Sequence, residues 1–299
     1  MFRPSPEVDA ALRGGLAVVA LESTLVAHGL PWPTNLETAL EAESAVRRAG
    51  AVPATVAVVG GEIRIGLSGP ELEHLARSGT YRKLGRRDLS AAVARGLDGA
   101  TTVSATLWVA RKSGIDVMAT GGLGGVHRGT DFDVSADLDE LAAADGMLVV
   151  CSGVKTILDV PATLEALETR GVAVVGYGTD TLPGFTARST GLPLEWRADT
   201  PEEAAAIVGA HRGLGLPGAV ILARPVDEAD AVDGGLMASA IASAESEARA
   251  SGLSGKALTP FLLARVREAT GGRSLRANRS LIVTNAGLAG GVASAVRGG

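Results

Sequence analysis

The chain has 299 residues, of which 46% are apolar and 20% are charged, and its formal net charge is −5 at pH 7. This apolar content can build a large core, so a wholly disordered chain is excluded. An acidic chain without a long apolar run offers no general attraction to nucleic acid and no membrane span. The single cysteine, Cys151, cannot form an internal disulfide, so we expect a reducing, cytoplasmic location.

Short apolar runs alternate with amphipathic stretches of helix length along most of the chain. The runs are bounded by Gly, Pro or charge, as in strands covered on both faces, and they predict strands at residues 17–21, 54–59, 117–119, 147–150, 173–175 and 219–222. The expected helices lie at residues 35–49, 89–94, 136–143, 157–169, 201–213, 236–251, 258–269 and 288–297. This alternation predicts an α/β fold, a three-layer α/β/α sandwich with a mostly parallel central sheet.

One local exception and the domain organisation follow from the same pattern. Gly60 and Gly61 separate two strand-like runs and predict a hairpin, hence a short antiparallel pair. The last third, from about Asp230, is mostly helical, and we expect it to wrap the sheet. Because the chain has no repeat of fixed period and no long linker, residues 1–299 are predicted to form a single domain.

A glycine-rich run from Thr120 to Gly129 follows the expected strand at residues 117–119. It does not match the dinucleotide pattern, because His127 stands where the third glycine is required, and it lacks the Lys and Ser/Thr of a P-loop. Glycine backbone can approach an anion closely and present N–H groups to it. The alternative is a tight turn without a ligand.

Two ionisable residues lie where strands are expected to end. Lys155 follows the run at residues 147–150, at the expected start of a helix. A desolvated lysine there would have a lowered pKa and could act as a Schiff-base nucleophile, whereas the alternative is an ordinary solvated lysine. Glu22 interrupts another strand-like run. Apolar neighbours would raise its pKa and suit it to acid/base work, and the alternative is an exposed glutamate at a turn.

Acidic and basic groups complete the set. Asp133 and Asp137 share a face if their segment is helical, so one carboxylate could anchor a hard cation, while helix capping is the alternative. Lys83, Arg86 and Arg87 form a compact basic group that could bind a phosphate ester. The alternative is a solvated surface, which is more common for such groups. Together these features suit a phosphorylated sugar whose C1 can open to an aldehyde.

The sequence resembles the pseudouridine-5'-phosphate glycosidase family over nearly its whole length. The matching blocks are VALEST at 19–24, HG at 28–29, GAVPAT at 50–55, RRDL at 86–89, GATTV at 99–103, ATGGLGGVHRG at 119–129, FDVSADL at 132–138, KTILD at 155–159 and TPFLLAR at 259–265. The resemblance implies a homotrimeric α/β/α enzyme that is metal-assisted, usually by Mn²⁺. It would act reversibly on the carbon–carbon bond that joins uracil to ribose 5-phosphate.

The resemblance also implies roles for individual residues. Lys155 corresponds to the nucleophile, which would form an imine with C1 of the opened ribose, and Glu22 to the proton donor. Asp133 corresponds to the metal ligand. Substrate contacts fall on Lys83 and on residues in two of the blocks: Val103, Ser135, Ala136 and Asp137. His127 and Asn285 are further candidates. Because binding alone needs no nucleophile, this set argues against a non-catalytic phosphosugar-binding protein.

The departures from the family pattern lie around the expected aglycone site. The usual GYQTDEFPAFY is GYGTDTLPGFT at residues 176–186, and smaller or different side chains stand at Gly178, Gly184, Thr186, Arg224 and Thr284, with Trp108 in place of a smaller aliphatic residue. Such changes would weaken uracil binding or enlarge a pocket, if these positions line one. The alternative function is therefore a C-glycosynthase that attaches ribose 5-phosphate to an aromatic polyketide, as in alnumycin biosynthesis.

Overall fold

The computed structural model describes residues 1–128, 133–253 and 258–298. The predicted glycine run and acidic block thus lie partly outside the described residues, at Gly129, Asp131 and Phe132. Within the described part, eleven strands form one sheet in the order β1-β4-β3-β2-β7-β8-β11-β9-β10, with β5 and β6 joined at β3. The strands are β1 (Phe2–Pro4), β2 (Val18–Glu22), β3 (Val52–Val59), β4 (Glu62–Ile65), β5 (Arg82–Leu84), β6 (Gly99–Thr101), β7 (Val117–Ala119), β8 (Leu148–Cys151), β9 (Ala173–Tyr177), β10 (Trp196–Ala198) and β11 (Val220–Ala223).

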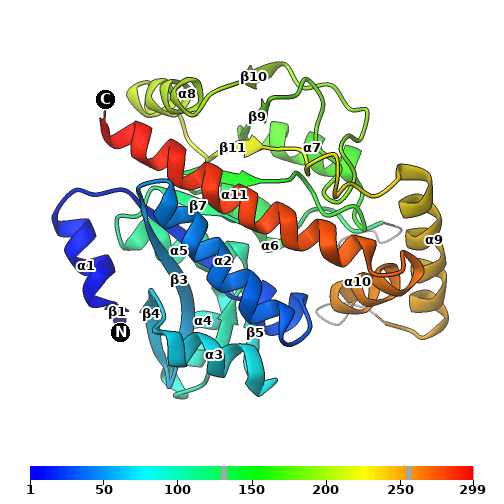
Figure 1. The fold of residues 1–299 in the computed structure, drawn as a ribbon, viewed down its shortest axis with the longest axis horizontal. Coiled ribbons are helices and arrows are strands. Elements are labelled where there is room, and N and C mark those ends of the chain that lie inside the picture. Colours follow the sequence, from blue (N-terminus) through cyan, green and yellow to red (C-terminus); the bar gives the residue numbers. More distant parts are fainter. Residues whose placement is uncertain (129–132, 254–257, 299) are drawn as a thin grey trace.

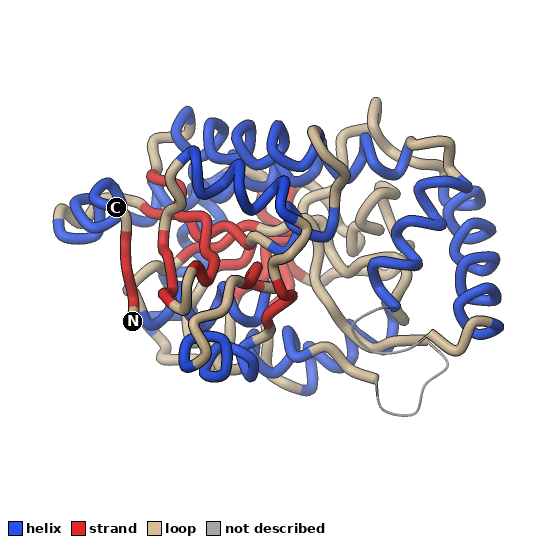
Figure 2. The backbone as a smooth tube through the Cα atoms, turned by 90° about the horizontal axis from the view of Figure 1, so that it is seen from below, coloured by secondary structure: helices blue, strands red, loops and turns tan. Residues whose placement is uncertain are grey.

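Helices cover both faces of this sheet, which appears as a layer between them in Figure 2. They are α1 (Pro6–Arg13), α2 (Thr34–Arg48), α3 (Gly69–Ser78), α4 (Leu89–Ala94), α5 (Val103–Lys112), α6 (Ala136–Ala142), α7 (Val160–Thr169), α8 (Pro201–Gly213), α9 (Gly234–Ala250), α10 (Leu258–Ala269) and α11 (Arg273–Gly298), with a π-helical turn η1 (Leu25–Gly29) and a 3₁₀ turn η2 (Arg86–Asp88). Figure 1 shows α2 and α11 side by side in front of the sheet and α5 and α6 behind it. The predicted three-layer fold is confirmed.

The predicted strands all exist, with ends shifted by one or two residues, because each is apolar on both faces and buried between helices. The hairpin at Gly60 and Gly61 is also confirmed, since β3 and β4 are antiparallel. Among the described residues, no helix is long and apolar enough to cross a membrane.

One predicted boundary is wrong in a way that matters for function. The helix expected at residues 157–169 begins at Val160, because the Asp159 carboxylate accepts the backbone N–H of Ala162 at 3.0 Å and caps the helix there. Lys155 therefore lies in the loop between β8 and α7, and not at a helix start.

The topology gathers several strand ends at one place. β2, β7 and β8 are parallel neighbours, so their carboxyl ends meet at one edge of the sheet. β3 continues past Glu22, and its residues Ala57 and Val58 pair with the antiparallel strand β6. Because β5 is parallel to β6, both return toward the end of β2. The backbone N–H of Thr101 donates to Ser23 Oγ at 2.9 Å and fixes this junction.

Candidate active site

A cavity of about 420 Å³ lies where these carboxyl ends meet. It is enclosed by the ends of β2, β5 and β6, by the starts of α5 and α6, and by the loops that follow β7 and β8. All the site residues predicted from the sequence line it except Asn285: Glu22, Lys83, Val103, His127, Asp133, Ser135, Ala136, Asp137 and Lys155. Open α/β sheets bind ligands at this edge, so the cavity is the candidate active site.

Glu22 is a buried acid of the cavity, with 6% of its surface exposed. Burial raises the pKa of its carboxyl group, although the Lys155 ammonium and a hydrogen bond donated by the Thr120 hydroxyl partly oppose the shift. This direction agrees with the rise predicted from the sequence, and it favours the protonated form of Glu22.

Lys155 enters the cavity from a tightly held loop. Its backbone N–H donates to the carbonyl of Leu123 at 3.1 Å. Gly153, two residues earlier, has φ +82°, and a Cβ there would lie 2.3 Å from the Pro183 carbonyl oxygen, so only glycine fits. The amine thus comes from a rigid backbone and approaches Glu22 closely enough for their charges to interact.

The wall of the cavity next to α5 and α6 depends on Asp137. Its two carboxylate oxygens accept the backbone N–H groups of Ser104 and Gly124, each at 2.9 Å. Ser135 caps α6 by accepting the N–H of Asp137 at 3.2 Å, which confirms the capping alternative. Asp133 precedes this helix, so the expectation that Asp133 and Asp137 share a helical face is wrong.

The glycine run is used mainly for close packing. The backbone N–H groups of Leu123, Gly124, Val126 and His127 all donate to other parts of the protein, so they cannot hold an anion. A Cβ on Gly124 would lie 2.3 Å from Ser135 Oγ, which explains the need for glycine there. The tight-turn alternative describes these four amides better than the anion-binding prediction.

The predicted basic group divides between two tasks. Lys83, on β5, and Arg87 line the cavity. Arg86 instead pairs with the fully buried carboxylate of Glu140 at 3.0 Å, and Arg111 approaches the same carboxylate at 3.4 Å. Arg86 therefore anchors the turn that presents Arg87 to the cavity.

His127 and Asp133 lie opposite one another, because the backbone N–H of His127 donates to the carbonyl of Asp133 at 2.9 Å. Burial lowers the pKa of the His127 imidazole, and the nearby Asp133 carboxylate opposes this shift. Among the described residues, no cluster of three or more His, Cys, Asp or Glu could hold a metal ion by itself. An ion here would have to take further oxygen ligands from water or from a substrate.

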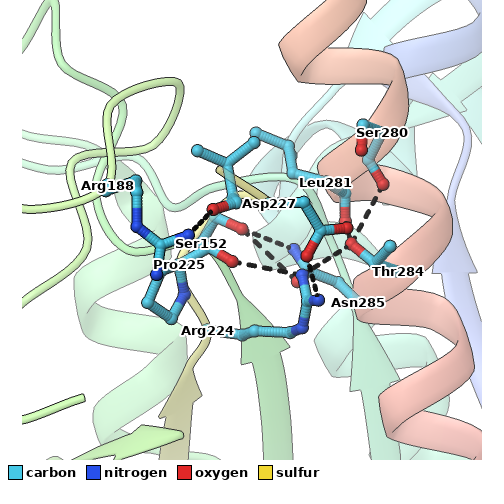
Figure 3. Close-up of polar contacts among 10 residues, drawn as sticks. Ser152, Arg188, Arg224, Pro225, Asp227, Ser280, Leu281, Thr284 and Asn285 are labelled. Atoms are coloured by element: carbon cyan, nitrogen blue, oxygen red, sulfur yellow. Dashed lines mark hydrogen bonds and ion pairs between the residues drawn. The ribbon is translucent and has the colours of Figure 1, made fainter. Parts of the chain in front are cut away.

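Asn285 is fully buried on α11, outside the lining of this cavity. Its carboxamide donates to Ser152 Oγ at 3.1 Å (Figure 3). It also donates to the carbonyl of Thr120 at 2.9 Å, so it joins α11 to the ends of β7 and β8. The geometry assigns Asn285 to support of the site, because its amide hydrogens are already used within the protein.

The departures from the family pattern also lie mostly away from cavities. Arg224 donates to Thr284 Oγ1 at 3.0 Å and pairs with Asp227 at 2.6 Å, so these side chains form one polar cluster (Figure 3). Thr186 differs, because it lines a second, more apolar cavity of about 250 Å³. A smaller side chain at Thr186 could therefore widen a pocket, whereas Arg224 and Thr284 bond to other parts of the protein.

Sequence reasoning missed Thr120, the residue that holds Glu22. The sequence does carry a signal for Thr120, which directly follows the strand at residues 117–119. That strand is parallel to β2, so Thr120 and Glu22 lie at the same edge of the sheet. Arg87 was grouped with Lys83, but nothing in the sequence separates it from Arg86.

A buried carboxyl group and an amine, placed together at the carboxyl edge of a parallel sheet, define this protein as an α/β enzyme. Comparison with known proteins gives the family. The family model for "Indigoidine synthase A like protein" matches residues 7–295. The chain is 54% identical over 296 residues to a pseudouridine-5'-phosphate glycosidase of Methylobacterium nodulans, covering 98% of this chain and 88% of that one. It is also 54% identical over 294 residues to one of Streptomyces griseus, covering 97% and 91%.

Two solved structures share the fold. The prealnumycin C-glycosynthase AlnA, in complex with ribulose 5-phosphate, superposes with a TM-score of 0.91 at 40% identity, covering 100% of this chain and 97% of that one. An indigoidine synthase A-like protein of Thermotoga maritima gives a TM-score of 0.91 at 36% identity, with 99% and 97% covered. The chain belongs to the pseudouridine-5'-phosphate glycosidase family.

Proposed function

We propose that this protein catalyses the reversible cleavage of pseudouridine 5'-phosphate to uracil and ribose 5-phosphate. The observation that carries this proposal is that Glu22 and Lys155 face one cavity with two basic residues, Lys83 and Arg87. The relatives named as glycosidases are 54% identical to this chain, against 40% for the C-glycosynthase. This difference favours the glycosidase over the aromatic-polyketide alternative.

The geometry supports a sequence of proton and bond changes. Lys83 and Arg87 would hold the phosphate, since cations bind phosphate oxygens through charge-assisted hydrogen bonds. Glu22 would give its proton to the ring oxygen of the sugar as the bond from C1 to that oxygen breaks, with the electron pair passing to oxygen. The electron-rich base donates electron density to C1 until the Lys155 amine bonds to C1 and passes a proton to the ionised Glu22.

Release of the base then reverses the electron flow. The base takes a proton from Glu22 at the carbon bonded to C1. The nitrogen lone pair of Lys155 then forms a double bond to C1 as the carbon–carbon bond breaks, and the electron pair of that bond passes to the base. Water hydrolyses the resulting protonated imine to ribose 5-phosphate and the free amine, and the released proton returns to Glu22. An amine nucleophile makes the usual pair of glycosidase carboxylates unnecessary.

We also propose that Asp133 holds a divalent cation, Mn²⁺, with the His127 imidazole beside it. One carboxylate with substrate oxygens and waters is an ordinary donor set for a hard cation. When bound, the ion would supply positive charge to the oxygens of the substrate. Chelation should lower activity, and Asp133→Asn should weaken restoration by Mn²⁺. Asp139→Asn, which alters an exposed ion pair with Arg170, should leave the restoration by Mn²⁺ unchanged.

The deciding experiment traps the covalent intermediate. Purified protein with Mn²⁺ and pseudouridine 5'-phosphate should release uracil and ribose 5-phosphate, and borohydride should attach the sugar to Lys155, as seen by mass spectrometry. Lys155→Ala should lose both results. Lys112→Ala, which removes the lysine at the end of α5, should keep them. Sugar attached elsewhere, or no release by the unaltered protein, would overturn the proposal.

The assembly and location are proposed on the resemblance and on composition. We infer a homotrimer, which light scattering on the purified protein would test. A cytoplasmic location agrees with the single, fully buried thiol of Cys151.

A further inference from the structure

The reaction centre does not end at Lys155 but continues into two adjoining cavities. A narrow neck of about 60 Å³ shares Glu22, Lys83 and Lys155 with the main cavity. On its other side the neck shares His28 and Phe185 with the apolar cavity of about 250 Å³, here called the chamber. The three cavities therefore adjoin in an order that runs from the amine that would hold the sugar to a separate space beside α10 and α11.

The chamber is lined mainly by apolar side chains, several of which are buried in the hydrophobic core. Ile157, Met237 and Val266 are each at most 4% exposed. Further lining comes from Leu263 on α10, Leu275 on α11 and Thr186. Methionine sulfur and aliphatic groups of this kind make favourable contacts with aromatic rings. Arg267 also lines the chamber, but none of the charged residues of the main cavity does, so most of this wall suits an apolar group.

The neck carries an unused hydrogen-bond acceptor. His28 lies on the π-helical turn η1, and its ring donates a hydrogen bond to the backbone of Tyr81. Its Nε2 is buried and has no partner within the part of the chain that the structure describes. Burial and the nearby Lys83 lower the pKa of this imidazole, so Nε2 keeps its lone pair. Such an atom suits an N–H group of the aglycone.

Phe185, which also lines the neck, has a strained backbone conformation. Phe185 has φ +58°, a conformation that non-glycine residues seldom adopt. Its N–H donates to the Ser152 carbonyl at 2.9 Å, and a Cβ on Gly122 would lie 2.6 Å from its ring. Strain of this kind is retained where the surrounding structure fixes a functional group. The ring of Phe185 is therefore held in a fixed position where the aglycone would pass.

We propose that the chamber binds the part of the aglycone that points away from the broken bond, so that the enzyme accepts uracil carrying an apolar aromatic extension. This inference rests on the proposed function. Uracil bonded through its carbon would place a ring N–H at His28, and an aryl group on another ring nitrogen would enter the chamber. The shape of the path, rather than the substituted positions Arg224 and Thr284, sets this tolerance.

The test compares pseudouridine 5'-phosphate with its N1-benzyl derivative. We expect the wild-type enzyme to cleave both with kcat/KM values within about tenfold of each other, since an apolar pocket discriminates weakly among groups that fit. Ala264→Phe adds a ring at the chamber wall and should lower kcat/KM for the benzyl derivative at least about tenfold more than for the parent. Ala269→Phe, exposed on the same helix, is the matched control and should change neither value.

The outcomes distinguish a failure of the chamber assignment from a failure of the proposed function. Efficient cleavage of the parent with a benzyl derivative more than about a hundredfold poorer would overturn the chamber assignment, as would equal losses in Ala264→Phe. Cleavage of the benzyl derivative alone would overturn uracil as the substrate and keep the chamber, and cleavage of neither would overturn both. The wild-type comparison needs no variant, and Thr186→Leu provides a second filling of the chamber if Ala264→Phe does not fold.

Discussion

Glu22 and Glu43 are chemically similar residues with different surroundings. Each carboxylate accepts a hydrogen bond from a threonine hydroxyl, Thr120 for Glu22 and Thr55 for Glu43. Burial raises the pKa of both groups. Only Glu22 lines the cavity, because β2 ends there, whereas Glu43 lies on α2. The pair therefore separates the effect of a buried carboxyl group from that of a catalytic one.

Replacing Glu22 with glutamine should raise stability at neutral pH and lower activity. The raised pKa means that the folded state resists ionisation, so stability falls as pH rises from the unfolded pKa through the folded pKa. Glu22→Gln removes that loss and should raise Tm at neutral pH, while it lowers kcat by about 10²–10⁴ because the proton donor is gone. Thermal melts across pH and product release measure the two effects.

Glu43→Gln supplies the control for this prediction. It should also raise Tm at neutral pH, for the same reason, but leave kcat close to the wild-type value. If Glu22→Gln kept its kcat, the assignment of Glu22 as proton donor would be wrong. Equal losses of kcat in both variants would point to a general disturbance of the sheet.

At this scale the sequence predicted the ionisable residues that line the cavity but not the residues that support them. Glu22 and Lys155 could be predicted because apolar strands end beside them. His28 and Phe185 could not be placed in one neck, because η1 and the loop after β9 meet only through the folded chain. Asn285 was placed with the substrate because its block matched the family, whereas burial in α11 gives its amide protein partners.

At the scale of elements, helix α11 extends from Arg273 to Gly298 and was predicted only in its last part. Its earlier half contains many polar residues, which interrupt the apolar periodicity. Packing against α2 and the sheet, rather than intrinsic propensity, sustains such a helix. The three-residue strands β5 and β6 were missed for a similar reason, since they are defined by pairing with each other and with β3.

The tie between α11 and the sheet predicts a positioning role for Asn285. Asn285→Ala leaves the carbonyl of Thr120 and the hydroxyl of Ser152 without their buried partner, so the free energy of unfolding should fall by about 2–3 kcal/mol. Displacement of Thr120 would weaken its hydrogen bond to Glu22. Because that bond lowers the Glu22 pKa, the alkaline limb of the kcat/KM profile should move to higher pH.

The neighbouring residue is the control. Thr284→Ala removes a partly buried hydroxyl that accepts from Arg224, so stability should change by less than about 1 kcal/mol and the pH profile should stay in place. A loss of stability in Asn285→Ala without any movement of the pH profile would limit Asn285 to a structural role.

At the scale of the whole molecule, charge is distributed unevenly. The net charge of −5 would repel a phosphate dianion at long range. The cavity, however, brings three cations together, Lys83, Arg87 and Lys155. Asp88, Asp133 and Asp137 also line it, while burial favours the neutral form of Glu22. Field lines from such a cleft concentrate at its mouth, so the local cations rather than the net charge should control the approach of the substrate.

This balance predicts the effect of salt on the reaction. Raising the ionic strength should lower kcat/KM for pseudouridine 5'-phosphate by about tenfold or more, because screening removes the local attraction. Arg87→Gln removes an exposed cation at the cavity and should flatten this dependence. Arg95→Gln changes the net charge equally on an exposed site outside the cavity lining, and it should keep the wild-type slope. Equal slopes in all three proteins would show that Arg87 does not guide the phosphate, whereas equal flattening in both variants would assign the effect to net charge.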